Sequence, residues 1–159
     1  MRNRYLTMLV AALLLGAGAP AGTVAAPTDQ ATGSAKNARG DDMNVSAHGV
    51  LTDARGHVTL YFGSVGFRTK GDVNCLNVVG NRAAVSGTLN ETLPGFPSFT
   101  DFILLLEDNG SGRKDPPDRF VQIISNGPSD NECGLTEFDA FALSPVVQGN
   151  IELKNRVGP

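Results

Sequence analysis

Short runs of β-branched and aromatic residues recur along the chain, alternate with polar residues, and are separated by turn residues. Alternation at a period of two is typical of half-buried strands, and no long helical pattern follows the first 25 residues. The pattern predicts an all-β, antiparallel domain of about eight strands in successive hairpins. The predicted hairpins are Ser46–Thr52 with His57–Phe67, Val73–Val79 with Arg82–Leu89, Phe99–Glu107 with Arg119–Ser125, and Phe138–Leu143 with Val147–Leu153.

Successive hairpins favour an up-and-down β-barrel over a β-sandwich, because Greek-key sandwiches need long crossing connections. Residues 90–98 ("NETLPGFPS") are long enough to form one such crossing. A β-sandwich therefore stays open as the alternative architecture.

The dipeptide Gly80-Asn81 is a two-residue hairpin signal with glycine first. It predicts that Val79 pairs with Arg82, which gives the hairpin one buried and one mostly wet face. The buried face would carry Leu76, Val78, Ala83, Val85 and Leu89, and the wet face Cys75, Asn77, Arg82, Ser86 and Thr88.

The stretch "DARG" predicts a second tight hairpin, with His48 opposite Tyr61 and His57 opposite Thr52. The two histidines would then lie about 13 Å apart along the ladder, too far to share a metal ion. The core face of this hairpin would carry Leu51, Val58, Leu60 and Phe62, and Thr59 would join the polar residues on the other side.

The chain begins as secretory signal peptides do, with Arg2 and Arg4 before an uncharged run from Leu6 to Ala19 and then small residues. The run is shorter than the ~20 residues of a membrane span, and no second such run follows. Residues 1–25 are therefore predicted to be a signal peptide cleaved after Ala25, and an uncleaved anchor helix is the alternative. The mature protein is expected to be secreted, extracellular and without a membrane span.

Removal of the two arginines leaves 13 − 2 = 11 basic residues against 16 acidic residues, a net charge of −5. Nucleic-acid binding requires a basic face, and anchoring at a membrane surface requires clustered Lys and Arg; the sequence shows neither. Residues 26–42 are small and polar without apolar periodicity, which predicts a disordered leader. The remaining residues, 43–157, are the length of one all-β domain.

Two cysteines, Cys75 and Cys133, are the only ones in the chain. An even count in an exported protein predicts a disulfide, which would restrict the unfolded chain by ~4 kcal/mol in the entropy model. Because Cys75 falls on the predicted wet face, Cys133 must reach it from a loop over that face. The polar residues 126–136 are expected to form that loop.

The most polar stretch lies between two apolar runs, at residues 107–118 ("EDNGSGRKDPPD"). Asp108 is followed at the third and fifth positions by Gly110 and Gly112, where an EF-hand loop needs side-chain oxygens. The stretch is therefore predicted to be a solvated hairpin, and no metal or cofactor is expected. Calcium binding is the alternative, through Glu107, Asp108, Asp115 or Asp118.

Other chemical signatures are missing or weak. There is no nucleophile elbow, phosphate loop or dinucleotide fingerprint, and the acidic residues give no signal of carboxylates paired across a cleft. Sequons for N-glycosylation begin at Asn44, Asn90 and Asn109, but so short a pattern recurs by chance. No catalytic residue is predicted.

The stretches "DVNCLNVVGNRAAVSGTL", "LEDNGSGRKDPPDRF" and "VVQGNIEL" together resemble a family of small exported β-rich proteins from actinobacteria, a related domain of which is labelled post-COAP. The likeness runs from about Ala47 to Leu153. It implies an exported β-rich fold and assigns no activity. The shared motifs are all turn and strand signals, so no catalytic residue carries over from the family.

Two functions from different classes follow. The first is an exported, non-enzymatic β-domain that binds a partner at the cell envelope or outside the cell. If the domain is a barrel, a small apolar ligand in its lumen is the expected occupant. The alternative is a secreted hydrolase that acts through the turn carboxylates Asp108, Asp115 and Asp118.

Overall fold

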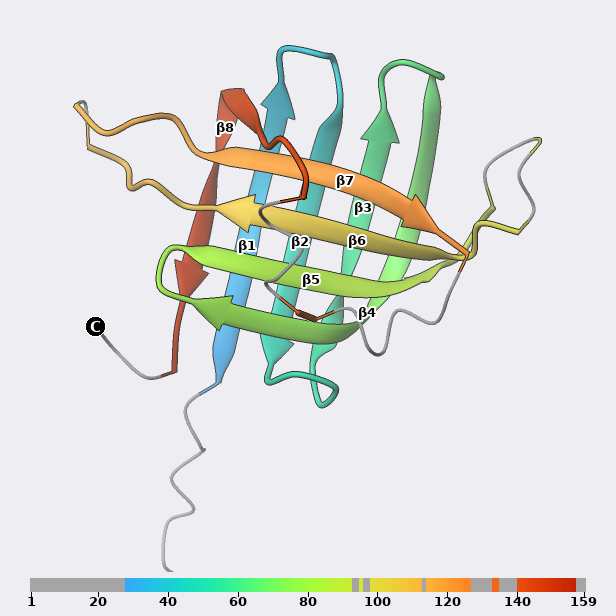
Figure 1. Cartoon of the computed structure of the whole chain (residues 1–159), viewed down its shortest axis with the longest axis horizontal. Helices are drawn as coiled ribbons and strands as arrows, with labels where there is room; N and C mark the ends of the chain where they lie inside the picture. The colour runs from blue at the N-terminus through green and yellow to red at the C-terminus, as the bar shows by residue number, and fades with distance from the viewer. Residues whose placement is uncertain are drawn as a thin grey trace, which may run out of the picture.

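The computed structural model describes residues 28–92, 95, 98–112, 114–126, 133–134 and 140–156. These residues form β1 (Asp29–Asn37), β2 (Asp42–Gly49), β3 (Arg55–Phe62), β4 (Phe67–Val79), β5 (Arg82–Leu89), β6 (Asp101–Glu107), β7 (Arg119–Ser125) and β8 (Ser144–Lys154). Each strand pairs antiparallel with the next, and β8 returns to β1. The predicted up-and-down barrel of eight strands is confirmed, and the sandwich alternative is wrong (Figure 1). No helix within these ranges is long and apolar enough to cross a membrane.

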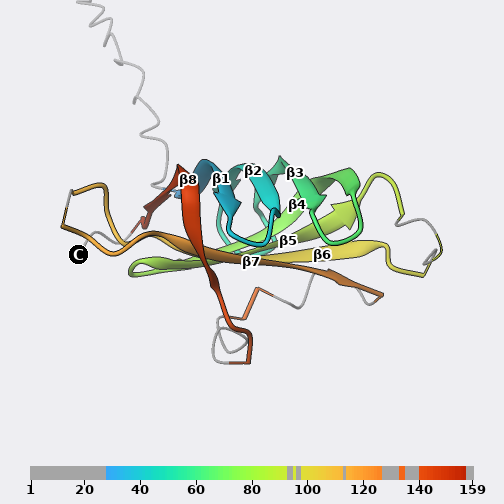
Figure 2. The same ribbon diagram turned by 90° about the horizontal axis from the view of Figure 1, so that it is seen from above.

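The barrel is flattened into two layers whose strands cross steeply (Figures 1 and 2). We call β8, β1, β2, β3 and the start of β4 the first layer, and the end of β4 with β5, β6 and β7 the second layer. Two long strands form the corners between the layers. β4 pairs with β3 through its first half and with β5 through its second half, with a register shift between Val73 and Cys75. β8 pairs with β7 only at Ser144 and Pro145, and then follows β1.

Apolar side chains from both layers fill the interior. Phe102 is fully buried and lies against Gly71 of β4 and Gly87 of β5. A Cβ atom on either glycine would come within 2.7 or 2.8 Å of the Phe102 ring. Glycine is therefore required at both positions so that one large ring can fill the space between two strands. The largest fully buried side chains include Met43, Leu60, Leu76, Leu104, Leu106 and Phe120.

The hairpin around Gly80-Asn81 has the predicted register, with Val79 opposite Arg82 and Leu76 opposite Val85. Gly80 has a φ of 61°, the left-handed conformation that a Gly-first turn needs. All five residues predicted for its buried face belong to the core. Here turn chemistry and alternation agree, so the local sequence defines the pairing.

The β2–β3 hairpin keeps the predicted faces but not the predicted register. His48 lies opposite Arg55 and His57 opposite Ser46, so the pairing differs by six positions from the expected one. An even shift leaves Val58 and Leu60 in the core, because side chains alternate with a period of two. Leu51, however, is not a core residue: it lies in the connection with a φ of 48° and is 48% exposed.

The predicted disordered leader is wrong for most of its length, because β1 covers Asp29–Asn37 and β2 begins at Asp42. The inward side chains of β1 are small or polar, as in Ala31, Gly33 and Ala35, so no hydrophobic pattern marks the strand. β1 is held in the sheet by backbone pairing with β2 on one side and with β8 on the other. Residues 1–27 lie outside the described ranges, so the signal peptide stays a prediction.

The last predicted hairpin is also wrong. Residues 140–143 are not a strand, and Ser144-Pro145, expected to be the turn, opens β8. Pro145 is tolerated because it stands at the start of the strand, where β8 passes from β7 to β1. The other predicted strand residues of this hairpin, 138 and 139, lie outside the described ranges.

Candidate functional site

The acidic hairpin between β6 and β7 connects the second layer to β8. Asp118 is 6% exposed, and its two carboxylate oxygens accept the backbone N–H of Asn109 at 2.9 Å and of Ile151 at 2.8 Å. Asp108 accepts the backbone N–H of Leu153 at 2.9 Å. Both acids therefore bind backbone donors of β8, at positions where β7 is no longer its neighbour.

These carboxylates replace a missing part of the β7–β8 ladder. That ladder contains only two residue pairs, after which the N–H of Val146 donates to the carbonyl oxygen of Asp118 at 2.8 Å. Backbone N–H groups left without acceptors at a strand edge are costly when buried. The acids of the predicted solvated hairpin thus have a structural role at its base, while its tip, from Gly110 to Gly112, is exposed as predicted.

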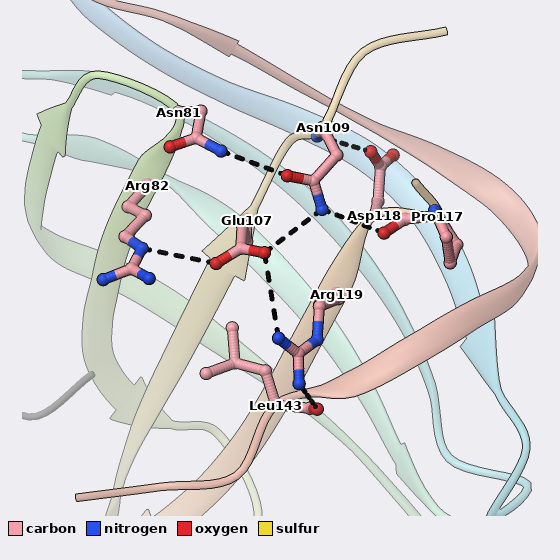
Figure 3. Close-up of polar contacts among 8 residues, drawn as sticks. All are labelled: Asn81, Arg82, Glu107, Asn109, Pro117, Asp118, Arg119 and Leu143. Carbon is pink, nitrogen blue, oxygen red and sulfur yellow. Dashed lines mark hydrogen bonds and ion pairs between the residues drawn. The ribbon is translucent and has the colours of Figure 1, made fainter. Parts of the chain in front are cut away.

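Glu107 is the centre of a second set of polar contacts (Figure 3). Its carboxylate lies 3.3 Å from Nε of Arg82 and 4.0 Å from Nη1 of Arg119, and it accepts Nδ2 of Asn109 at 3.1 Å. Asn109 also donates to the carbonyl oxygen of Pro117 at 2.9 Å. These contacts join β5, β6 and β7 to the base of the hairpin.

The structure gives the hydrolase alternative limited support. Asp115 and Asp118 both line a hollow of about 270 Å³ between the hairpin and β8. Both oxygens of Asp118 already accept backbone N–H groups, and Asp115 accepts the N–H of Gly112 at 2.7 Å. A general acid or nucleophile must reach the substrate with an oxygen atom. Asp108 does not line this hollow, and it binds Leu153 instead.

Metal binding finds no support in the described ranges, where no group of three or more His, Cys, Asp or Glu residues could hold an ion. His57 lies opposite Ser46 on one side and Asp72 on the other, and His48 lies opposite Arg55. The histidines are thus two positions apart along the ladder rather than four.

The predicted disulfide between Cys75 and Cys133 is present. Asn77 beside it donates from Nδ2 to the carbonyl oxygen of Cys133 at 2.9 Å. Cys133 therefore lies over the outer face of the second layer, as expected. Apart from Cys133 and Gly134, the loop residues 127–136 lie outside the described ranges.

The centre of the outer face of the second layer is apolar and buried. Of the residues that the β4–β5 hairpin predicted to be wet, Arg82 and Thr88 are exposed, whereas Cys75 and Ser86 are buried. Leu105 and Ala84 are fully buried there, and Leu143 packs on them from the segment before β8. Val121 and Ile123 of β7 extend the same cluster. This face is thus a small second core, closed from outside by residues that follow β7 in the chain.

A lumen ligand does not fit the structure. Side chains that line an internal cavity large enough for a ligand retain accessible surface. Inward residues from both layers, such as Val58, Leu60, Leu104 and Phe120, have none. The interior is a packed core.

The outer face of the first layer carries polar residues, which the registers arrange in rows across five strands. The rows, each running from β8 through β1, β2 and β3 to β4, are Gln148–Lys36–Asp42–Tyr61–Arg68, Asn150–Ser34–Asn44–Thr59–Lys70 and Glu152–Thr32–Ser46–His57–Asp72. We call these three rows the polar face. All its residues are exposed or half-buried.

The polar face is hollowed along its first row. A hollow of about 350 Å³ is lined by Lys36, Asp42, Arg68 and Gln148 together with Ser34 of the second row. Arg68 is held in place by Asp42 at 3.1 Å and by the ring of Tyr61, whose centroid lies 5.1 Å from Cζ. We call this the first-row hollow. Gln148 and Gly149 separate it from the hollow beside the acidic hairpin.

Comparison with family models, with curated proteins and with solved structures finds no match to this chain. The polar face was not predicted from the sequence. Its signal is present in the alternation of small polar residues along β1, β2 and β3, but the registers were needed to assemble the rows.

Proposed function

We propose that the protein is an exported, non-enzymatic binding module that holds an extended polysaccharide on its polar face. The observation that carries this proposal is the unbroken polar character of three rows across five neighbouring strands. Hydroxyl, amide and charged groups at neighbouring positions on one face can form hydrogen bonds with a polar ligand from several strands at once.

The chemistry of the face suits a chain of sugars. Hydroxyl and amide side chains such as Ser34, Asn44 and Thr59 both donate and accept hydrogen bonds, as sugar hydroxyl groups do. Strands lie about 4.8 Å apart, so a row of five spans about 19 Å. That spacing is comparable to the rise of one sugar residue in an extended polysaccharide, so successive residues could meet successive strands.

Export is part of this proposal. The N-terminal sequence and the resemblance to small exported β-rich proteins support it, and the Cys75–Cys133 disulfide fits an oxidising compartment. The mature chain recovered from the culture medium is expected to begin near Ala26. Intact-mass measurement tests this, and a membrane-bound, full-length product would contradict it.

Binding is tested by co-sedimentation and biolayer interferometry with a panel of neutral and acidic polysaccharides. Asn44 is exposed at the centre of the second row, so Asn44→Arg should block the face without disturbing the core. The matched control is Ser64→Arg in the exposed β3–β4 turn. Wild type and the control should bind, and Asn44→Arg should not. Equal binding by all three, or no binding by wild type, would defeat the proposal.

The non-enzymatic part is tested with the same polymers. Their chain length and reducing ends should not change during incubation with the protein. If polymers are cut, and if Asp115→Asn or Asp118→Asn abolishes the cutting in a folded protein, the hydrolase alternative replaces this proposal.

A further inference from the structure

We propose that the first-row hollow selects acidic polysaccharides, by binding an anionic group of the chain between Lys36 and Arg68. This inference rests on the proposed function, since it names the class of polysaccharide that the polar face would hold. The anionic group is a carboxylate of a uronic acid or a phosphodiester between sugars or polyols.

The hollow contains two cations and one anion, and one of the cations has no partner among the described residues. Asp42 and Arg68 form an ion pair with 3.1 Å between Oδ2 and Nη2. Lys36, which lies opposite Asp42 in the β1–β2 ladder, has no ion pair or hydrogen bond from its side chain to any described residue. The hollow thus carries one net positive charge from described residues, although the chain as a whole is acidic.

The geometry of Arg68 suits an anion. Its guanidinium group lies over the Tyr61 ring and pairs with Asp42, and both contacts restrict its position before a ligand arrives. A guanidinium group has five donors in a fixed plane, and a single carboxylate partner leaves some of them available. An anion in the hollow could therefore accept hydrogen bonds from Arg68 and from Lys36 at once, with Gln148 and Ser34 beside it.

The negative net charge of the protein distinguishes binding in the hollow from a general attraction between protein and polymer. An anionic polymer is repelled by an acidic protein, so a preference for it must come from a local site and not from overall attraction. The attraction between exposed charges weakens as salt shortens the screening length from about 10 Å at 0.1 M to about 3 Å at 1 M. The preference for acidic chains should therefore be strongest at low salt.

The test compares polymers that differ in charge. Polygalacturonate, its methyl ester and poly(glycerol phosphate) are the probes for biolayer interferometry with the mature chain. Wild type should bind polygalacturonate or poly(glycerol phosphate) at least fivefold more tightly than the methyl ester, in line with one or two exposed charge contacts. The stronger of the two acidic probes identifies which anionic group the hollow prefers.

The variants locate the effect. Lys36→Met removes the unpaired charge but keeps the apolar stem, and Arg68→Gln removes the second cation. The matched control is Arg55→Met, at an exposed position of β3 outside the three rows. Both hollow variants should lose the preference, so that they bind the acidic probes no more tightly than the methyl ester, and the control should keep the preference of wild type. Circular dichroism and melting confirm that all three fold.

The outcomes separate this inference from the proposed function. The proposed selectivity of the hollow is wrong if wild type binds the ester and the acidic chains equally, or if Lys36→Met keeps the preference. Either result leaves the proposal of a polysaccharide-binding face intact. If wild type binds no probe and no other polysaccharide, both proposals fail.

Discussion

The two outer faces of the barrel differ in character at their centres, although they belong to one closed sheet. On the first layer every outward position in three rows is polar, and no described segment lies over it. At the centre of the second layer the outward positions are apolar, and residues after β7 cover them, with Leu143 packed on the cluster and Cys133 bonded to Cys75. At one end of this face the outward residues Arg82, Glu107 and Arg119 are charged and form ion pairs. The comparison shows that the residues on a strand's outer face depend on what lies over them, which is solvent on the first layer and a later segment of the chain on the second.

The sharpest way to break this comparison is to exchange the character of one residue on each face. Leu105→Asn places an amide in the fully buried outer cluster of the second layer. The lost apolar burial and the unpaired amide should lower the free energy of unfolding by about 3–5 kcal/mol. Asn44→Leu on the polar face should change it by no more than about 0.5 kcal/mol. Chemical denaturation measures both, and similar losses would show that the two faces are not different in kind.

Removal of the disulfide should separate the covering segment from the second layer. Cys133→Ser should cost of order 2–5 kcal/mol, the usual effect in a small secreted domain. The strand content should stay the same by circular dichroism, because the barrel ladders do not depend on Cys133. The apolar outer face should become accessible and bind the dye ANS. A variant that melts like wild type and binds no dye would mean that apolar packing alone holds the segment in place.

In unreduced wild type, thiol titration after denaturation should find close to zero thiols.

The acidic hairpin gives a smaller and more local contrast, between acids that bind β8 and one that does not. Asp118→Ala removes acceptors from two backbone N–H groups and should lower stability by about 3 kcal/mol, or about 10 °C in Tm. Asp115→Ala is the control, because Asp115 is exposed and, among the described residues, its side chain accepts only the N–H of Gly112 within its own loop. It should melt within about 2 °C of wild type by differential scanning calorimetry. Equal losses would place the acids in one shared network instead.

Calcium provides a further control on the same samples. A ligand bound only to the folded state at a hundred times its Kd adds about 2.7 kcal/mol to stability. Melting should be the same in millimolar calcium and in excess chelator, because Asp108 and Asp118 already bind backbone donors and the hairpin lacks the ligand spacing of a calcium loop. A rise of several degrees with calcium would make the hairpin a metal site.

The sequence by itself determined the features that depend on neighbours along the chain. The all-β class, the register at Gly80-Asn81 and the buried residues of that hairpin follow from alternation and turn chemistry. The disulfide followed from a cysteine count and an expected location. The predicted β2–β3 register was wrong by six positions, but Val58 and Leu60 still lie on the predicted side of the sheet. A shift by an even number of residues keeps every side chain on the same side, because side chains alternate with a period of two.

Tertiary structure decided what depends on contacts distant in the chain. β1 carries no hydrophobic pattern, and only closure between β2 and β8 makes its small residues a strand. Likewise, Asp108 and Asp118 look like loop acids until β8 brings the N–H groups of Leu153 and Ile151 to them. The polar face also needed the structure, since each row joins residues from five strands. A sequence records the alternation within each strand, but only the pairing of strands places those residues side by side.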